Sequence, residues 1–168
     1  MCELYDFPAG TMSIGRLDQN SEGLLLLTTN GVVSAQVRSK KVEKEYYIQV
    51  DGEITETALE QLKNGVEIRT KNRQYLTLPC KAHRLATAPV FEFPPKKVRD
   101  ERHGPTSWLS ITITEGKFRQ IRKMSAAVGF PTLRLVRIRI GAVHLGKLQA
   151  GEEIEVDDFK IEKANDKI

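Results

Sequence analysis

The residue best placed for chemistry in this sequence is Asp18, in the segment Gly15–Gly23 that precedes the four leucines of residues 24–27. A turn rich in Asn, Ser and Gly holds such a side chain rigid and exposed, where it can act as a nucleophile or a base. The leucine run is too short to span a membrane, and we interpret it as a strand buried on both faces. The sequence therefore predicts an accessible carboxylate at the lip of a core strand.

Basic residues are concentrated between positions 115 and 139, which hold seven lysines and arginines and one acid. The pattern predicts a helix over 117–128, on which Arg119, Arg122 and Lys123 share one flank. Guanidinium groups match the geometry of phosphate oxygens, so this run favours phosphate recognition. An ordinary solvated helix face is the alternative that stays open.

A third group lies in residues 44–50, which alternate aromatic, β-branched and polar side chains as a strand does. Tyr46 and Tyr47 then point to opposite faces, so at most one of them lies in a given cleft. A core tyrosine with its hydroxyl at the edge is the competing interpretation. The three histidines stand far apart and have neither Ser-His-Asp nor metal-ligand spacing, so we expect no metal site.

The 168-residue chain is long enough for one domain with a substantial core. No apolar run is long enough for a transmembrane helix, and the N-terminus lacks the basic and apolar regions of a signal peptide. Cys2 and Cys80 are isolated, which indicates a reducing cytoplasm and no structural zinc. The net charge is +4, but +8 outside an acidic tail at 152–168, which favours a polyanionic partner.

The segments between these groups predict the elements that position them. Helices are expected at 31–38 after an Asn30 cap, at 56–63 after a Thr55 cap, and at 117–128 with Phe118 and Ile121 facing the core. Strands are expected at 44–50, two or three within 66–85, 108–114, 133–141 and short pieces within 143–156, with an irregular basic loop at 86–107. The predicted fold class is α+β, with a mixed, mostly antiparallel sheet and flanking helices.

Four blocks occur along the chain in this order: Gly15–Asp18 with Ser21–Leu25, Lys44–Tyr46, Glu115–Met124, and Leu133–Arg137 closed by Gly141. Through these blocks, residues 12–156 resemble the RNA pseudouridine synthases of the ribosomal small-subunit type. Two stretches, 105–109 and 128–135, are most similar to the branch of large ribosomal subunit synthases designated E. The resemblance implies the pseudouridine synthase catalytic fold as a single domain over 1–168, and isomerisation of uridine to pseudouridine in ribosomal RNA, with 23S rRNA of the large subunit expected.

The resemblance also implies roles for individual residues. Asp18 matches the catalytic aspartate, Tyr46 the tyrosine that stacks on the base and helps proton transfer, and Arg122 the basic partner of the aspartate. RNA-binding is expected at Arg16, Lys44, Lys117, Arg119, Gln120, Lys123, Arg134 and Arg137. The reaction breaks the N1–C1′ bond, turns the base over and bonds C5 to C1′ without redox change, so we expect no cofactor. A nearby guanidinium favours the charged carboxylate, and the target uridine has to leave its stack.

Several alternatives stay open at this point. Asp18 has three candidate roles, which are attack at C1′, attack at C6 and abstraction of a sugar proton. Family members usually carry a strand upstream of the Asp18 motif, and we expect this chain to lack it, because Met1 precedes Asp18 by only 17 residues. A non-catalytic RNA-binding or ribosome-assembly protein is one competing function. A glycosidase that uses Asp18 and Glu22 is another, although arginine-rich surroundings favour RNA. We expect a cytoplasmic monomer with ribosomal RNA as its partner.

Overall fold

The computed structural model describes residues 5–39, 41–71, 73–94, 96 and 98–159. A six-stranded sheet forms its centre, with strand order β10–β9–β4–β8–β7 and β2 paired to β9. The strands of this sheet are β2 (Glu22–Gly23), β4 (Lys44–Asp51), β7 (Lys81–Arg84), β8 (Thr106–Ile113), β9 (Thr132–Ile140) and β10 (Val143–His144). Only the β2–β9 pair is parallel within this sheet. The prediction of an α+β fold with a mixed, mostly antiparallel sheet is confirmed.

Two smaller pairs of strands and three α-helices complete the described structure. The paired strands are β1 (Met12–Ser13) with β3 (Leu27–Thr28), and β5 (Glu67–Arg69) with β6 (Gln74–Leu76). The helices are α1 (Gly31–Arg38), α2 (Glu56–Asn64) and α3 (Gln120–Ala127), with a 3₁₀ turn at Glu101–His103. Asn30 and Thr55 cap α1 and α2 as predicted, because their side-chain oxygens accept backbone N–H groups of the first turn. Among the described residues, no helix is long and apolar enough to cross a membrane.

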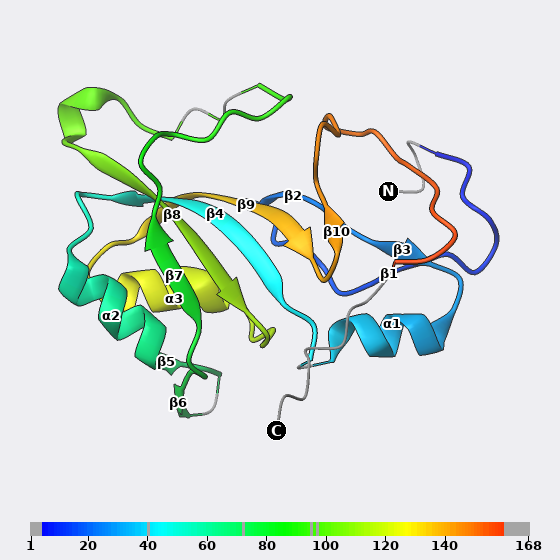
Figure 1. Cartoon of the computed structure of the whole chain (residues 1–168), viewed down its shortest axis with the longest axis horizontal. Coiled ribbons are helices and arrows are strands. Elements are labelled where there is room, and N and C mark those ends of the chain that lie inside the picture. The colour runs from blue at the N-terminus through cyan, green and yellow to red at the C-terminus, as the bar shows by residue number, and fades with distance from the viewer. Residues whose placement is uncertain (1–4, 40, 72, 95, 97, 160–168) are drawn as a thin grey trace.

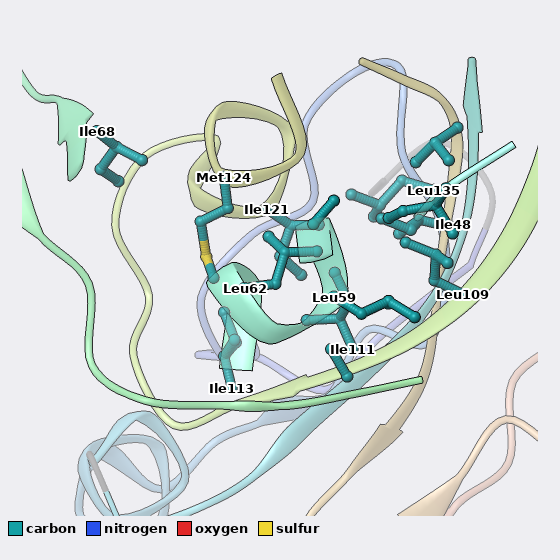
Figure 2. Packing of buried hydrophobic residues seen from close by; sticks show 14 residues of the cluster. Ile48, Leu59, Leu62, Ile68, Leu109, Ile111, Ile113, Ile121, Met124 and Leu135 are labelled. Carbon is teal, nitrogen blue, oxygen red and sulfur yellow. The ribbon is translucent and has the colours of Figure 1, made fainter. Parts of the chain in front are cut away.

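The sheet buries a different hydrophobic cluster on each face. On one face, α2 and α3 pack against β4, β8 and Leu135 of β9, and Figure 2 shows Leu62 and Met124 meeting at this contact. On the other face, Val136 of β9 joins residues from α1 and from the chain around β1–β3. Figure 1 shows α2 and α3 on one side of the molecule and α1 with β1 and β3 on the other. Neighbouring residues of β9 thus serve opposite cores, as the strand alternation requires.

The leucine run does not form one strand, so this prediction is wrong. Leu24 and Leu26 are buried, whereas Leu25 and Leu27 are only half-buried. Gly23, at the end of β2, pairs with β9 in the central sheet, whereas Leu27 begins β3, which pairs with β1. The chain therefore leaves one sheet and enters another within these four residues. A run of leucines shows that the segment is buried, but it does not show which strands will pair with it.

The helix predicted over 117–128 begins only at Gln120, and Phe118 is 53% exposed instead of facing the core. Arg119 has φ +51°, a left-handed conformation that a helix cannot continue through. Ile121 and Met124 are buried as expected. Near the C-terminus only β10 is a strand, and described residues 145–159 form no strands. Residues 152–158 of the acidic tail are exposed, and 160–168 lie outside the described residues.

Candidate active site and RNA-binding cleft

The loop that carries Asp18 is fixed at both ends by backbone contacts. Before the loop, Ile14 N–H donates to Leu26 O at 2.8 Å, which joins it to the β3 side. After the loop, Gly23 lies against β9, where a Cβ on Gly23 would stand 2.3 Å from Arg137 O. Only glycine, which also accepts the observed φ of +99°, permits this approach. The loop is therefore fixed to β3 on one side and to β9 on the other, and a rigid scaffold of this kind positions functional residues on loops.

Asp18 itself begins a tight turn within this loop. Its carbonyl accepts a hydrogen bond from Ser21 N at 2.8 Å, which fixes the backbone at the carboxylate. The Asp18 side chain is 24% exposed, so solvent reaches it although most of its surface is covered by protein. Arg119 Nη1 lies 3.9 Å from Asp18 Oδ2 and forms an ion pair with it. The carboxylate is therefore held close to a cation that immediately precedes α3.

Arg122, expected to pair with Asp18, makes different contacts in the structure. Its Nη2 donates to Asn20 O at 2.7 Å and its Nη1 donates to Thr132 O at 3.3 Å. Burial and the charge of Arg119 lower the pKa of Arg122, while the charge of Asp18 acts to raise it. The Arg122 guanidinium therefore interacts electrostatically with the Asp18 carboxylate, but its hydrogen bond is to the backbone of the loop. It ties α3 and β9 to the turn that presents Asp18.

A buried glutamate builds the turn that precedes α3. Glu115 is 3% exposed and accepts hydrogen bonds from Tyr75 Oη, Leu78 N–H and Gln120 Nε2. Burial alone would raise the pKa of Glu115, but these three hydrogen bonds outweigh it and lower the pKa. Gln120 Oε1 in turn accepts from Lys117 N–H at 3.0 Å. Gln120, expected to bind RNA, is thus 3% exposed and shapes the turn from inside.

Tyr46 enters the site from the middle of the sheet. Its Cα partners are Ile111 on β8 and Arg137 on β9, and the register with β9 shifts between Glu45 and Tyr46. Such an irregularity re-aims a side chain relative to a regular strand. Tyr46 is half-buried and lines the same cleft as Asp18. Of the two neighbouring tyrosines, the structure thus places Tyr46 in the cleft.

Lys44 lies beside Tyr46 at the start of β4, and no carboxylate among the described residues pairs with it. Its Nζ donates to Ser39 O and Thr114 O, both at 3.2 Å. Burial, and to a smaller extent the charge of Arg137, lowers the pKa of Lys44 to about 8. The ammonium group is therefore satisfied in its hydrogen bonds, yet it adds positive charge to the cleft at neutral pH.

These residues meet in one cleft of about 310 Å³. Its wall combines the Asp18 loop, the start of β4, the turn before α3 and the middle of β9. The basic residues that line it are Arg16, Arg38, Lys44, Lys117, Arg119, Arg122 and Arg137. Its acidic lining residues are Asp18 and Glu115, and the Glu115 carboxylate is occupied by the three hydrogen bonds described above. The cleft is thus strongly positive around one available carboxylate, an arrangement that attracts a polyanion.

Two residues expected to bind RNA lie outside the cleft lining. Arg134 is 6% exposed and forms a bidentate ion pair with Glu22, at 2.9 and 3.1 Å. Its guanidinium also lies over the ring of Phe91, 5.1 Å from the centroid. Lys123 is half-buried, with its Nζ 5.5 Å from the centroid of the Phe118 ring. Arg134 is therefore built into the sheet, whereas Lys123 borders the cleft from α3.

Sequence reasoning missed Arg38 and misplaced Phe118, and both line the cleft. Arg38 ends α1, and its Nε donates to Ser34 O at 3.3 Å. A basic residue at a helix C-terminus is ordinarily explained by its interaction with the helix dipole, so the position of Arg38 in the sequence does not indicate a binding site. Within the described parts of the chain, no three His, Cys, Asp or Glu side chains gather closely enough to hold a metal ion. The cleft can therefore offer a carboxylate, a phenol and an array of cations to a substrate.

Comparison with known proteins identifies the family to which the chain belongs. The sequence profile described as RNA pseudouridylate synthase matches residues 5–127. Ribosomal large subunit pseudouridine synthase E of Vibrio parahaemolyticus is 44% identical over 144 residues, which cover 84% of this chain and 58% of that protein. The protein of the same name from Xanthomonas campestris is 41% identical over 160 residues, which cover 93% of this chain and 82% of that protein. The chain thus spans little more than half the length of the Vibrio relative.

Solved structures give the same result for the fold. A crystal structure titled pseudouridylate synthase superposes with a TM-score of 0.69 at 27% identity, covering 89% of this chain and 58% of that one. A Cbf5-Nop10-Gar1 complex gives a TM-score of 0.55 at 15% identity, over 83% of this chain and 43% of that one, which shows the shared fold alone. Because the family profile covers most of the chain and the relatives exceed 40% identity, the chain belongs to the RNA pseudouridylate synthase family.

Proposed function

We propose that this chain isomerises uridine to pseudouridine in ribosomal RNA, with Asp18 as its catalytic carboxylate. The observation that carries the proposal is the convergence of Asp18, Tyr46 and Arg122 on one basic cleft. The relatives from Vibrio and Xanthomonas are named for the large ribosomal subunit, and this supports large-subunit rRNA as the substrate. In this proposal the chain acts as a monomer in the cytoplasm, with ribosomal RNA as its partner.

In this proposal each residue acts at a stated bond. The Asp18 carboxylate assists rupture of the N1–C1′ bond, by attack on the nucleoside or by taking a proton from the ribose. Tyr46 stacks on the detached uracil while the ring turns, and it takes the proton from C5 after C5 has bonded to C1′. N1 gains a proton, so no atom of the uridine is lost. Arg122 is a positioning residue, because its hydrogen bond to Asn20 O fixes the loop that carries the carboxylate.

The basic lining residues would hold the RNA backbone on either side of a flipped uridine. Unpaired bases in loops and bulges can be splayed into a pocket, whereas a base inside a helix first has to leave its stack. Arg16, Lys117 and Arg119 line the cleft and are the residues for phosphate contacts. The glycosidase alternative requires a second free carboxylate, and Glu22 is instead bound by Arg134 on both of its oxygens.

The test is pseudouridine formation in unmodified large-subunit ribosomal RNA, mapped by base-selective chemical labelling. The chain, Asp18→Asn and a control Glu60→Gln are compared, since Glu60 is an exposed carboxylate on α2 that pairs with Lys63 outside the cleft. We expect one new site from the chain and the control, and none from Asp18→Asn. Normal turnover by Asp18→Asn would refute the assigned carboxylate. RNA binding without any product would instead favour the non-catalytic RNA-binding protein.

A further inference from the structure

Phe118 is an exposed aromatic residue at the rim of the cleft. Its side chain is 53% exposed although the residue lies between the buried Glu115 and Gln120. Phe118 does not face the core because Arg119 adopts the left-handed conformation, which places residue 118 outside the helix that follows. Non-glycine residues in this conformation cluster at functional sites, where the strain serves a purpose. The ring is thus held outside the core by a specific backbone feature.

Two cations flank this ring and come from different elements. Arg16 Cζ lies 5.9 Å from the ring centroid, and Arg16 belongs to the Asp18 loop. Lys123 Nζ lies 5.5 Å from the same centroid, and Lys123 belongs to α3. Both distances are within the range of cation–π attraction. The ring therefore links the loop that carries the catalytic carboxylate to the helix at the edge of the cleft.

The neighbourhood of Phe118 determines what kind of partner fits the ring. Its sequence neighbours Lys117 and Arg119 are basic, as are the two residues that lie over it. A protein partner would need a continuous apolar patch with a polar rim, and an exposed ring with two cations over it and basic sequence neighbours does not provide one. An unpaired nucleotide does fit, because its base has a π-face and its phosphate is negative. Aromatic rings among basic residues are the general means of binding single-stranded RNA.

We propose that Phe118 is a stacking platform for an unpaired base next to the uridine that enters the cleft, with Arg16 and Lys123 placed for the adjoining phosphates. The identity of that uridine rests on the proposed function, whereas the platform itself rests on the exposed ring and its cations. Stacking is tolerant of base identity, so the platform contributes affinity and holds the flanking nucleotide in position. It leaves the reacting atoms to the residues inside the cleft.

The first test measures stacking directly, without requiring catalysis. The probe is a short single-stranded oligouridylate with one central 2-aminopurine, whose fluorescence is quenched when it stacks on an aromatic ring. The chain is compared with Phe118→Leu, Phe118→Trp and Tyr5→Leu, the last of which removes a partly exposed ring that does not line the cleft. We expect quenching with the chain, Phe118→Trp and Tyr5→Leu. Phe118→Leu should lose the quenching and bind on the order of tenfold more weakly.

The second measurement separates this inference from the proposed function. With the mapped ribosomal substrate, Phe118→Leu should raise KM on the order of tenfold with little change in kcat, because the ring holds a base that does not react. Unchanged affinity and quenching in Phe118→Leu would overturn the platform, whatever the enzyme does. Quenching that depends on Phe118 in a chain that makes no pseudouridine would support the platform and refute the proposed function.

Discussion

Replacing Glu22 by Gln should destabilise the protein strongly, although Glu22 lies near the surface loop of the site. Its carboxylate holds Arg134 through two hydrogen bonds, and the two side chains are 19% and 7% exposed. Glu22→Gln leaves the arginine charge buried without a counter-charge, and breaking a buried pair in this way costs about 3–5 kcal/mol. We expect the lower part of that range, because the amide oxygen still accepts one hydrogen bond. For a chain of this length, about 3 kcal/mol lowers the melting temperature by roughly 6–12 °C.

Arg134→Met provides the matched comparison, since it removes the charge but keeps an unbranched apolar chain beside the rings of Phe91 and Trp108. The carboxylate left behind is the more exposed member of the pair, so we expect a smaller loss of about 1–2 kcal/mol. The double variant should be more stable than the sum of the two single losses predicts, because neither charge is then left alone.

Urea unfolding followed by circular dichroism measures all four proteins of this cycle. A loss below about 0.5 kcal/mol in Glu22→Gln, the size of an ordinary surface substitution, would refute the reasoning. So would strict additivity in the double variant, because it would show that the two side chains act independently.

Two further predictions concern the backbone and the charge of the site. Gly23→Ala should lower the free energy of unfolding by about 2–5 kcal/mol, of which about 1–3 comes from overlap with Arg137 O and about 1–2 from the positive φ. Gly15 has φ +71° and nothing within 4 Å of a new Cβ, so Gly15→Ala should lose only the about 1–2 kcal/mol that the positive φ costs. Urea unfolding of both variants measures these losses. Similar losses in both would contradict the overlap. Folding lowers the pKa of Lys44 from 10.5 to about 8, so between these pH values the unfolded chain binds more protons than the folded chain. The free energy of unfolding, measured relative to that of Lys44→Met, should therefore rise with pH across this window. Unfolding curves of both proteins at a series of pH values measure this difference. A flat difference would show that the lysine is not desolvated.

Elements with local signals could be predicted from the sequence, and those set by distant contacts could not. Asn30 and Thr55 mark the starts of two helices through hydrogen bonds that span three residues at most, so their sequence is sufficient. The start of α3 depends instead on Glu115, whose partners Tyr75 and Leu78 are about forty residues earlier in the chain. Propensity favours a helix through this turn, and the buried carboxylate overrides it.

The site shows the same division between local and distant information. Sequence reasoning chose Asp18, Tyr46 and Arg122, and the structure brings these three to one cleft. Their exact contacts could not be predicted, because Arg122 reaches Asn20 across 102 positions of the chain. The burial of Arg134 depends on Glu22, at a separation of 112. A motif identifies which residue types gather, but the partner of each charge is decided by the tertiary fold.

The basic residues of this chain fall into two classes that their sequence does not separate. Arg134 and Arg139 form ion pairs with glutamates, so their charges are neutralised within the sheet. In the cleft, Lys44, Arg122 and Arg137 donate to backbone carbonyls, which leave the positive charge intact. Arg122 Nε and Arg137 Nη2 are buried and have no hydrogen-bond partner among the described residues. An anion arriving in the cleft therefore meets three cations that are already oriented and that pair with no carboxylate of the described residues, whereas Arg119 pairs with Asp18. Pre-organised charge of this kind is what recognition of a phosphate backbone requires, and it explains why a net charge of only +4 is compatible with a strongly positive site.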